Sequence, residues 1–483
     1  MYDVAIIGAG VTGAAIAREL SRYRLKIVVL EKSGDVAMGA SRANSGIVHA
    51  GFDCTPGTLM ARLNVLGSRL FPEVCRELTV PYFPIGSLVI GFDSEDAEEI
   101  GRLKEKGDAN GVPGLEIISG DEVRRREPNI SRAVTVALWA PSGAITCPYE
   151  LTLAFAENAI ANGTEFRFEF PVEAIARREG TFTITSKSGE AVESRFVVNA
   201  AGIFADDINR LAGGRPFKIV PRKGEYLMLD RAVGGIVNTV VFQTPNRWGK
   251  GVLVSPTADG NVYAGPTAMD IEDKTDSSTT AEGAWYIKKL SRKSVPGLPL
   301  NKAITSFAGL RAVAQGAGKS DFIIGREPGV PGFVNAAGMC SPGLSSSPAV
   351  GMLVAEELGL AGLELVKKDG FNPLRPKEKH FRDMTDDERR AAIERDSRYA
   401  HIVCRCETVT EAEVVAAIRS PIPALTMDGI KRRTRAQMGR CQGGFCGPRV
   451  MEIICRETGK TMEEITKGGR GSWLVRKKEA GTC

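Results

Sequence analysis

The sequence has no long hydrophobic run, and this absence bounds the class of protein. Its longest uncharged stretch, residues 328–355, is interrupted by glycine, proline and serine, whereas a transmembrane helix needs roughly 20 consecutive apolar residues. No charged and apolar leader precedes the first predicted strand, which begins at Tyr2, so we expect no secretory signal peptide. Both absences favour a cytoplasmic protein without a transmembrane segment; peripheral attachment to the inner face of the membrane is the alternative.

Histidine and aromatic residues are scarce. The 483 residues include three histidines, and aromatic residues make up 6% of the chain. Residues 397–483 are basic, with 16 Lys and Arg against 9 Asp and Glu, and residues 431–435 (KRRTR) hold much of this charge. No aromatic residues interleave with these cations as in nucleic-acid-binding modules, so we expect no nucleic-acid partner. The arginines are expected to offset the charge of a thiolate-bound centre or to face an acidic partner protein, docked around Arg433.

A glycine-rich turn lies near the start of the chain. Residues 2–7 form an apolar run of strand length, residues 8–13 read GAGVTG, and residues 14–24 have a helical pattern. A second predicted strand, residues 26–30, leads into Glu31. Strand, glycine turn, helix, strand and acid in this order are the fingerprint of a dinucleotide-binding βαβ unit. The fingerprint alone does not separate FAD from NAD.

The glycines of the fingerprint and its acidic residue each have a physical role. Gly8 makes the turn, Gly10 lets the backbone approach a pyrophosphate, and Gly13 lets the helix and strand pack closely. The helix N-terminus stabilises the phosphate charge. Glu31 is expected to accept hydrogen bonds from a ribose diol.

Two close pairs of cysteines predict a metal centre. Cys404 and Cys406 form the first pair, Cys441 and Cys446 form the second, and glycines around the second pair let the backbone turn tightly. Soft thiolates select iron–sulfur clusters, zinc or copper(I). Zinc, a pair of disulfides and four unrelated thiols remain alternatives. We favour a [2Fe–2S] cluster, because a flavin elsewhere in the chain would supply its electrons, and free thiols with a cluster fit a reducing compartment.

Four further stretches carry a resemblance that selects FAD. They are residues 39–51 (GASRANSGIVHAG), 197–202 (VVNAAG), 221–226 (PRKGEY) and 338–349 (GMCSPGLSSSPA). With the fingerprint, they make residues 1–365 similar to FAD enzymes of the D-amino-acid-oxidase superfamily. Within it, the chain most resembles the branch that includes FAD-dependent glycerol-3-phosphate dehydrogenases and L-2-hydroxyglutarate dehydrogenases.

The C-terminal segment resembles a second family. Residues 398–460 are similar to the bacterioferritin-associated-ferredoxin-like [2Fe–2S] domain. A body and tail of these two kinds are the layout of the A subunits of anaerobic glycerol-3-phosphate dehydrogenases. The resemblance implies one [2Fe–2S] cluster on the four paired cysteines. It also implies a hetero-oligomer with a second redox subunit, either a pyridine-nucleotide flavoprotein or a quinone-linked subunit.

The resemblance also implies which residues contact a non-covalently bound FAD. They lie in the glycine turn, at the ribose acid, in the loop that follows it and in two later loops. The expected FAD-binding residues are Gly8, Gly10, Val11, Thr12, Gly13, Glu31, Lys32, Ser41, Asn44, Ser45, Ala201, Gly202, Gly338, Gly343, Leu344 and Ser345.

The catalytic residues are expected in the same loops and in the substrate domain. A flavin dehydrogenase needs a base for the alcohol proton and a cation for an anionic substrate. By resemblance, His49 lies in the flavin-proximal loop, and Arg311 matches an arginine that binds the substrate anion, for which its planar fork is suited. Lys250 and Tyr226 are further substrate-binding candidates. The implied reaction is oxidation of sn-glycerol-3-phosphate to dihydroxyacetone phosphate.

Two departures from the family pattern keep alternatives open. Aerobic glycerol-3-phosphate dehydrogenases carry a lysine in the late flavin loop, where this chain has residues 338–341 (GMCS), and an arginine soon after the histidine segment, where it has residues 51–54 (GFDC). L-2-Hydroxyglutarate or another 2-hydroxy acid is therefore an alternative substrate. A non-catalytic electron-transfer subunit is the other alternative, and the presence of both His49 and Arg311 favours the enzyme.

The expected fold is α/β with three parts. These are a Rossmann-type FAD-binding domain, an interleaved substrate domain with an antiparallel sheet, and a small, mainly helical C-terminal cluster domain. The FAD-binding segments are residues 1–80, 145–225 and 305–365; the substrate segments are 81–144 and 226–304; the connector is 366–397, the cluster domain 398–460 and the tail 461–483.

Overall fold

A computed structural model of the chain describes residues 1–245, 251–315 and 321–476. These residues divide into two compact units. The first contains Met1–Lys32 and Val36–Arg375, and the second contains Ser33–Asp35 and Pro376–Cys483. Among the described residues, no helix is both long enough and apolar enough to cross a membrane.

The first unit is built on an eight-stranded sheet around the N-terminal strand. Its order is β10-β11-β12-β1-β2-β9, with β20 paired to β12 and β19 paired to β20. The strands are β1 (Tyr2–Ile7), β2 (Ile27–Leu30), β9 (Glu165–Arg167), β10 (Val172–Arg178), β11 (Thr181–Ser186), β12 (Ala191–Asn199), β19 (Ile323–Arg326) and β20 (Phe333–Ala337). The central strands β2, β1, β12 and β20 run parallel, so their carboxyl ends, where ligands bind in such sheets, share one edge.

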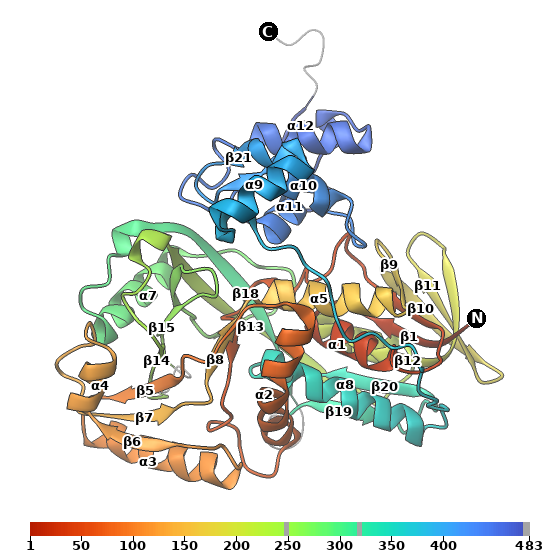
Figure 1. The fold of residues 1–483 in the computed structure, drawn as a ribbon. Helices are drawn as coiled ribbons and strands as arrows, with labels where there is room; N and C mark the ends of the chain where they lie inside the picture. The colour runs from red at the N-terminus through yellow and green to blue at the C-terminus, as the bar shows by residue number, and fades with distance from the viewer. Residues whose placement is uncertain (246–250, 316–320, 477–483) are drawn as a thin grey trace. The chain divides into compact units, whose positions relative to one another are not determined.

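Three helices lie beside this sheet and explain why its central strands are continuously apolar. They are α1 (Val11–Leu20), α5 (Pro148–Ala161) and α8 (Gly343–Leu360), which pack on one another near β1, β12 and β20 (Figure 1). Strands covered by helices read as runs of Val, Ile and Ala rather than alternating sequences. Residues Val4 and Ile6 of β1 are accordingly fully buried.

The second sheet has nine strands and is largely antiparallel. Its order is β17-β13-β16-β15-β14-β5-β7-β6, with β18 paired to β13. The strands are β5 (Ser87–Gly91), β6 (Glu116–Ser119), β7 (Val136–Ala140), β13 (Lys218–Leu229), β14 (Val240–Gln243), β15 (Leu253–Pro256), β16 (Val262–Gly265), β17 (Met269–Asp270) and β18 (Ala303–Gln315). Its longest pairing, β13 with β18, places Arg222 opposite Arg311.

A small three-stranded sheet holds the loop that carries His49. It consists of β3 (Ile47–Val48), β8 (Ala144–Thr146) and β4 (Tyr82–Phe83), in that order. Nearby, α2 (Leu59–Leu78) approaches the start of α8 so closely that a Cβ on Gly67 would lie 2.1 Å from the carbonyl oxygen of Ser345. Only glycine permits this contact. The remaining helices of the first unit are α3 (Ser94–Ala109), α4 (Gly120–Arg126), α6 (Ala205–Leu211) and α7 (Ala281–Ser294).

The second unit is small and mainly helical. Its helices are α9 (Asp386–Arg395), α10 (Glu411–Ile418), α11 (Met427–Thr434) and α12 (Gly447–Thr458), with a two-stranded ribbon of β21 (Ile402–Cys404) and β22 (Val409–Thr410). Its core is made of Val, Ile and Ala side chains with the buried thiols of Cys404 and Cys446. A capping box between Thr410 and Glu413 starts α10.

The predicted fold class is confirmed: two large sheets with helices, followed by a small helical unit. The interleaved assignment of FAD-binding and substrate segments stays a prediction.

Candidate functional site

The glycine turn after β1 leaves no room for side chains. Gly8 has a φ of +107°, and a Cβ there would lie 2.5 Å from the carbonyl oxygen of Ala200. A Cβ on Gly13 would lie 1.9 Å from the carbonyl oxygen of Gly8. Helix α1 begins directly after Gly10, which offers no capping side chain. The turn is therefore a tight backbone cradle at a helix N-terminus, the arrangement that binds a pyrophosphate.

Glu31 lies against this cradle. It follows β2 and is buried, and its Oε2 accepts a hydrogen bond of 2.8 Å from the backbone N–H of Ala9. Its neighbour Lys32 places Nζ 3.6 Å from the ring centroid of Phe204, in the turn that follows β12, and burial lowers the pKa of this lysine. The same turn contains Gly202, whose φ of +59° favours glycine. The acid and the turn after β12 thus border the cradle, as predicted.

The loop after the acid closes onto the start of α1. The Oγ of Ser41 accepts a hydrogen bond of 2.9 Å from the backbone N–H of Val11. The side chain of Asn44 accepts from the backbone N–H of Gly46 at 2.9 Å and donates to the carbonyl oxygen of Ala40 at 3.0 Å. Ser41 therefore joins the loop to the helix N-terminus, and Asn44 holds the loop's own conformation.

The late flavin loop, residues 338–345, contacts the loop that carries His49, although the two are about 290 positions apart in the sequence. Gly338 has a φ of +70°, and Gly343 begins α8. The Oγ of Ser345 accepts a hydrogen bond of 2.8 Å from the backbone N–H of His49 and donates to the carbonyl oxygen of Ile47 at 3.4 Å. The half-buried Leu344 lies between Gly343 and Ser345. Loops distant in the sequence thus meet around the cradle, and the residues present fit a dinucleotide cofactor.

Gly13→Ala should abolish binding of FAD to the glycine turn. The added methyl group would collide with the backbone of Gly8, which cannot move without opening the turn, so we expect the purified variant to contain no bound flavin, measured as FAD released on denaturation. Gly297→Ala is the matched control, because a Cβ there meets nothing within 4 Å. A Gly13→Ala protein that retains a full complement of FAD would contradict the role of this turn.

His49 projects from the loop that the late loop braces. Its Nε2 lies 3.3 Å from the Oγ of Ser341, and its ring centroid is 5.9 Å from that of Phe242. The ring is half-buried. It is therefore held between the late flavin loop and the second sheet, where a base for a bound substrate would be needed.

Arg311 lies on β18 and is held by backbone carbonyls. Its Nη2 donates to the carbonyl oxygen of Thr267 at 2.7 Å, and its Nε points to that of Arg222 at 3.4 Å. Burial lowers the pKa of the guanidinium. Backbone atoms of β13 and of the loop between β16 and β17 therefore fix the position of Arg311.

The other two substrate-binding candidates are Tyr226 and Lys250. Tyr226 is buried, with its ring stacked 4.7 Å from Phe307 and edge-on 5.8 Å from Tyr263. Burial raises the pKa of Tyr226. Tyr263 donates to the carbonyl oxygen of Ser45 at 2.7 Å, so both tyrosines pack behind the flavin loop, and a contact of Tyr226 with substrate stays a prediction. Lys250 lies outside the described residues.

The structure adds site residues that the sequence reasoning missed. Arg222 lies opposite Arg311 and forms a bidentate ion pair with Asp270, at 2.6 and 2.9 Å. Ser341 is the side-chain partner of His49. Arg222 and Ser341 both lie inside stretches that carry the family resemblance, and this was the available signal for them. Their partners could not be predicted, because these depend on the pairing of β13 with β18 and on a contact between two distant loops.

The four cysteines of the second unit form two pairs. The Sγ atoms of Cys406 and Cys441 are 3.7 Å apart, and the buried Cys404 and Cys446 are hydrogen-bonded to each other. Two thiolates about 2.3 Å from one tetrahedral metal lie roughly 3.8 Å apart, so the spacing of Cys406 and Cys441 suits one metal ion. Among the described residues, no three His, Cys, Asp or Glu side chains form a single-ion group. Two pairs fit a two-iron cluster better than one zinc ion.

Backbone N–H groups point at these sulfur atoms. The amides of Gln437 and Glu407 donate to Cys404, and that of Gln437 also donates to Cys446. The hydrogen bond between Cys404 and Cys446 lowers the pKa of Cys404 and raises that of Cys446, whereas the backbone amides lower the pKa of both. Amides directed at the sulfur atoms favour thiolates, the form that ligates soft metals.

The predicted docking of a partner around Arg433 is wrong, because these arginines are not available on the surface. Within the second unit, Arg433 forms a bidentate ion pair with Asp35 at 2.8 and 2.9 Å, and only 6% of its side chain is exposed. Burial would raise the pKa of Asp35, but the hydrogen bonds and charges of Arg433 and Arg432 lower it. Arg435 donates to the buried Glu407 at 2.8 Å.

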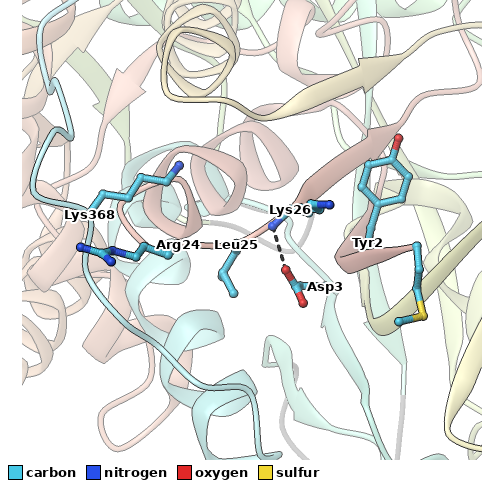
Figure 2. A pocket seen from close by; sticks show the side chains of 7 residues that line it. Tyr2, Asp3, Arg24, Leu25, Lys26 and Lys368 are labelled. Carbon is cyan, nitrogen blue, oxygen red and sulfur yellow. Dashed lines mark hydrogen bonds between the residues drawn. The ribbon is translucent and has the colours of Figure 1, made fainter.

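A surface hollow at the other edge of the first sheet is a different feature. It lies where β1 begins, whereas the glycine turn follows the end of β1, so it is not the cofactor site. Figure 2 shows the hydrogen bond of 2.8 Å that crosses it, from the backbone N–H of Lys26 to Asp3. Its lining residues are Met1, Tyr2, Asp3, Arg24, Leu25, Lys26 and Lys368.

Comparison with known families agrees with both cofactor sites. Residues 3–357 match the family described as FAD dependent oxidoreductase, and residues 402–456 match the BFD-like [2Fe-2S] binding domain. The predicted cofactors, FAD and a [2Fe–2S] cluster, are confirmed at this level.

Individual relatives share most of the chain. It is 47% identical over 476 residues to a glycerol 3-phosphate dehydrogenase of Caloramator mitchellensis, covering 98% of each chain. It is 28% identical to the mitochondrial L-2-hydroxyglutarate dehydrogenase of Homo sapiens, covering 74% of this chain and 88% of that protein. Among solved structures, the FAD-bound L-alpha-glycerophosphate oxidase of Mycoplasma pneumoniae superposes with a TM-score of 0.74 at 31% identity, covering 78% of this chain and 99% of that one.

Proposed function

We propose, from the premise that this chain belongs to the FAD dependent oxidoreductase family and carries a BFD-like [2Fe-2S] binding domain, that it oxidises sn-glycerol-3-phosphate at C2 to dihydroxyacetone phosphate. The electrons leave through the cluster to a second redox protein. The observation that carries the proposal is that Arg311 is held by neutral backbone carbonyls, while Ser341 of the late flavin loop contacts His49. The full-length similarity to a glycerol 3-phosphate dehydrogenase supports the choice of substrate.

Arg311 would bind the phosphate. Its hydrogen bonds in the structure go to neutral backbone carbonyls, whereas Arg222 opposite it is already bound to the carboxylate of Asp270. A buried guanidinium held by neutral groups gains from an anionic partner, and its planar fork can donate two parallel hydrogen bonds to phosphate or carboxylate oxygens. Arg311 therefore suits a small anionic substrate.

His49 would take the proton of the C2 hydroxyl. When bound, FAD supplies the acceptor for the hydride that leaves C2. The Nε2 of His49 is directed at Ser341, so the late loop sets the orientation of the ring. A half-buried imidazole can accept a proton near neutral pH, and general-base help of this kind contributes roughly 10²–10⁴-fold in rate.

The competing substrate is L-2-hydroxyglutarate or another 2-hydroxy acid. Similarity to an L-2-hydroxyglutarate dehydrogenase and the absence of a lysine from the stretch GMCS at residues 338–341 favour it. The same His49 and Arg311 would serve, with a carboxylate in place of the phosphate.

Anaerobic stopped-flow reduction of the bound flavin decides between these substrates. We expect sn-glycerol-3-phosphate to bleach the flavin absorbance of the isolated chain, and L-2-hydroxyglutarate to do so far more slowly. Reduction by the hydroxy acid alone would reverse the choice. Reduction by neither compound nor by related anionic alcohols would favour the remaining alternative, a subunit whose flavin serves a partner's chemistry.

The partner would be a separate redox protein in a hetero-oligomer, either a pyridine-nucleotide flavoprotein or a quinone-linked subunit. The reason is chemical: a cluster is not needed when flavin alone delivers electrons to oxygen. Location in the cytoplasm, with peripheral contact to the inner face of the membrane when the partner is quinone-linked, belongs to the same proposal.

A further inference from the structure

The cluster site of the second unit is asymmetric. Cys404 and Cys446 are each 1% exposed, whereas Cys406 and Cys441 are both exposed. A cluster on these four cysteines would be held by two buried and two exposed sulfur ligands. Cys406 and Cys441 are therefore the ligands that an electron acceptor could approach from solvent.

The residues around the exposed pair are unlike an ordinary surface. Phe445 is 61% exposed, directly before the buried Cys446, and the guanidinium carbon of Arg405 lies 4.8 Å from its ring centroid. Arg405 and Arg440 are themselves exposed, each next in sequence to one of the exposed cysteines. Exposed aromatic side chains beside arginine are typical of the centre of a protein–protein interface.

The residues adjacent in sequence to the exposed cysteines carry positive charge. Residues 440–449 contain no Asp or Glu, and Glu407, which follows Cys406, is 2% exposed. Its carboxylate accepts hydrogen bonds from Arg435 at 2.8 Å and from Arg382 at 3.0 Å. Glu407 is therefore turned into the unit, and the exposed Arg405 adds positive charge beside Cys406.

We propose that Arg405, Cys406, Arg440, Cys441 and Phe445, here called the cluster-edge surface, dock the electron acceptor, and that this acceptor is a redox protein with an acidic face. Complementary charge speeds the encounter of such partners and fixes their orientation, and Phe445 provides the apolar contact at the centre. The proposal rests on the proposed function, in which the cluster is the exit for electrons.

The transfer is an electron transfer without bond making. Each turnover removes two electrons from the substrate. A [2Fe–2S] cluster held by the four cysteines would supply them to the acceptor protein one at a time, so the acceptor would be reduced in two transfers at the exposed Cys406 and Cys441. The oxidant is the acidic acceptor protein itself.

The test uses the full-length holoenzyme and two protein probes of the same redox centre, a succinylated, acidic cytochrome c and the unmodified, basic cytochrome c. The cluster is first reduced with dithionite, and the excess is removed, so that transfer is measured without the substrate reaction. At low salt we expect the wild-type protein to reduce the acidic probe faster than the basic one, and Arg405→Glu to slow the acidic probe by about tenfold or more, with the salt dependence reduced. Phe445→Ala should slow the acidic probe at every salt concentration.

The controls keep docking separate from chemistry. Arg419→Glu, at the end of α10 and paired with Glu457 near the end of α12, should change neither rate. Substrate-driven reduction of the cluster within the holoenzyme should be unchanged in Arg405→Glu. The proposal is overturned if the wild-type protein does not prefer the acidic probe, if Arg405→Glu reduces it at the wild-type rate, or if Arg405→Glu slows reduction of the cluster by the enzyme's own flavin. Failure of the substrate to reduce the flavin would instead count against the proposed function alone.

Discussion

Arg311→Ala is expected to lower kcat/KM for sn-glycerol-3-phosphate by about 30-fold to 1000-fold, equivalent to about 2–4 kcal/mol of transition-state binding. The substituted enzyme would have to bind a phosphate at a partly buried position without its charge-assisted hydrogen bonds. Arg222 cannot take over this role, because both oxygens of Asp270 already hold its guanidinium. Steady-state kinetics of the purified variant, normalised to bound FAD, measure the loss.

Two further variants separate binding from chemistry. Arg222→Ala is the matched control for the loss of a neighbouring arginine, and its effect should be smaller because its charge is already neutralised within the pair. His49→Ala should slow flavin reduction at saturating substrate more than it raises the concentration needed for saturation. If Arg311→Ala retains kcat/KM within about threefold of the wild-type value, a difference of under 1 kcal/mol, Arg311 does not bind the substrate anion.

Local patterns were sufficient to predict much of the fold. The strand, turn and helix at the N-terminus follow from the GAGVTG spacing, because a Cβ at Gly8 or Gly13 would collide with the backbone. The highly charged stretch Asp386–Arg395 has the composition of an exposed helix, and α9 lies there. Short runs rich in β-branched and aromatic residues between turns coincide with β14, β15 and β16. Each of these elements is determined by residues within a few positions of one another.

Features that depend on distant partners could not be predicted. Arg222 and Arg311 are 89 positions apart, and only the register of β13 with β18 shows that they lie opposite each other. The basic run at residues 431–435 is typical of an exposed surface. Its arginines are instead paired with Asp35 and Glu407, which lie elsewhere in the sequence. A buried arginine needs hydrogen-bonding or charged partners, and a pattern of basic residues does not reveal where those partners are. The same limit applies to the cysteines. The sequence predicts four ligands, but it does not show that one cysteine of each sequence pair is exposed, Cys406 and Cys441, while the other is buried.

Cys404→Ser is expected to remove the [2Fe–2S] cluster while leaving FAD in place. Cys404 is buried, and its thiolate is stabilised by the hydrogen bond from Cys446 and by the amides of Gln437 and Glu407. A serine oxygen is a harder ligand than a thiolate and does not favour iron–sulfur chemistry. Because the four cysteines lie in a unit of their own, the glycine cradle of the first unit should be unaffected.

The expected result is a protein with a normal flavin content, flavin reduction by substrate at the wild-type rate, and no electron delivery to a protein acceptor. Iron, acid-labile sulfide and released FAD would be assayed after anaerobic purification, together with the electron paramagnetic resonance signal of the reduced cluster. Cys455→Ser is the matched control, because this half-buried thiol in α12 belongs to neither pair and its loss should leave the cluster intact. Zinc in place of iron in the wild-type protein, or full iron and sulfide in Cys404→Ser, would contradict the assignment of these ligands. Loss of FAD together with the cluster would show instead that the two cofactor sites do not fold independently.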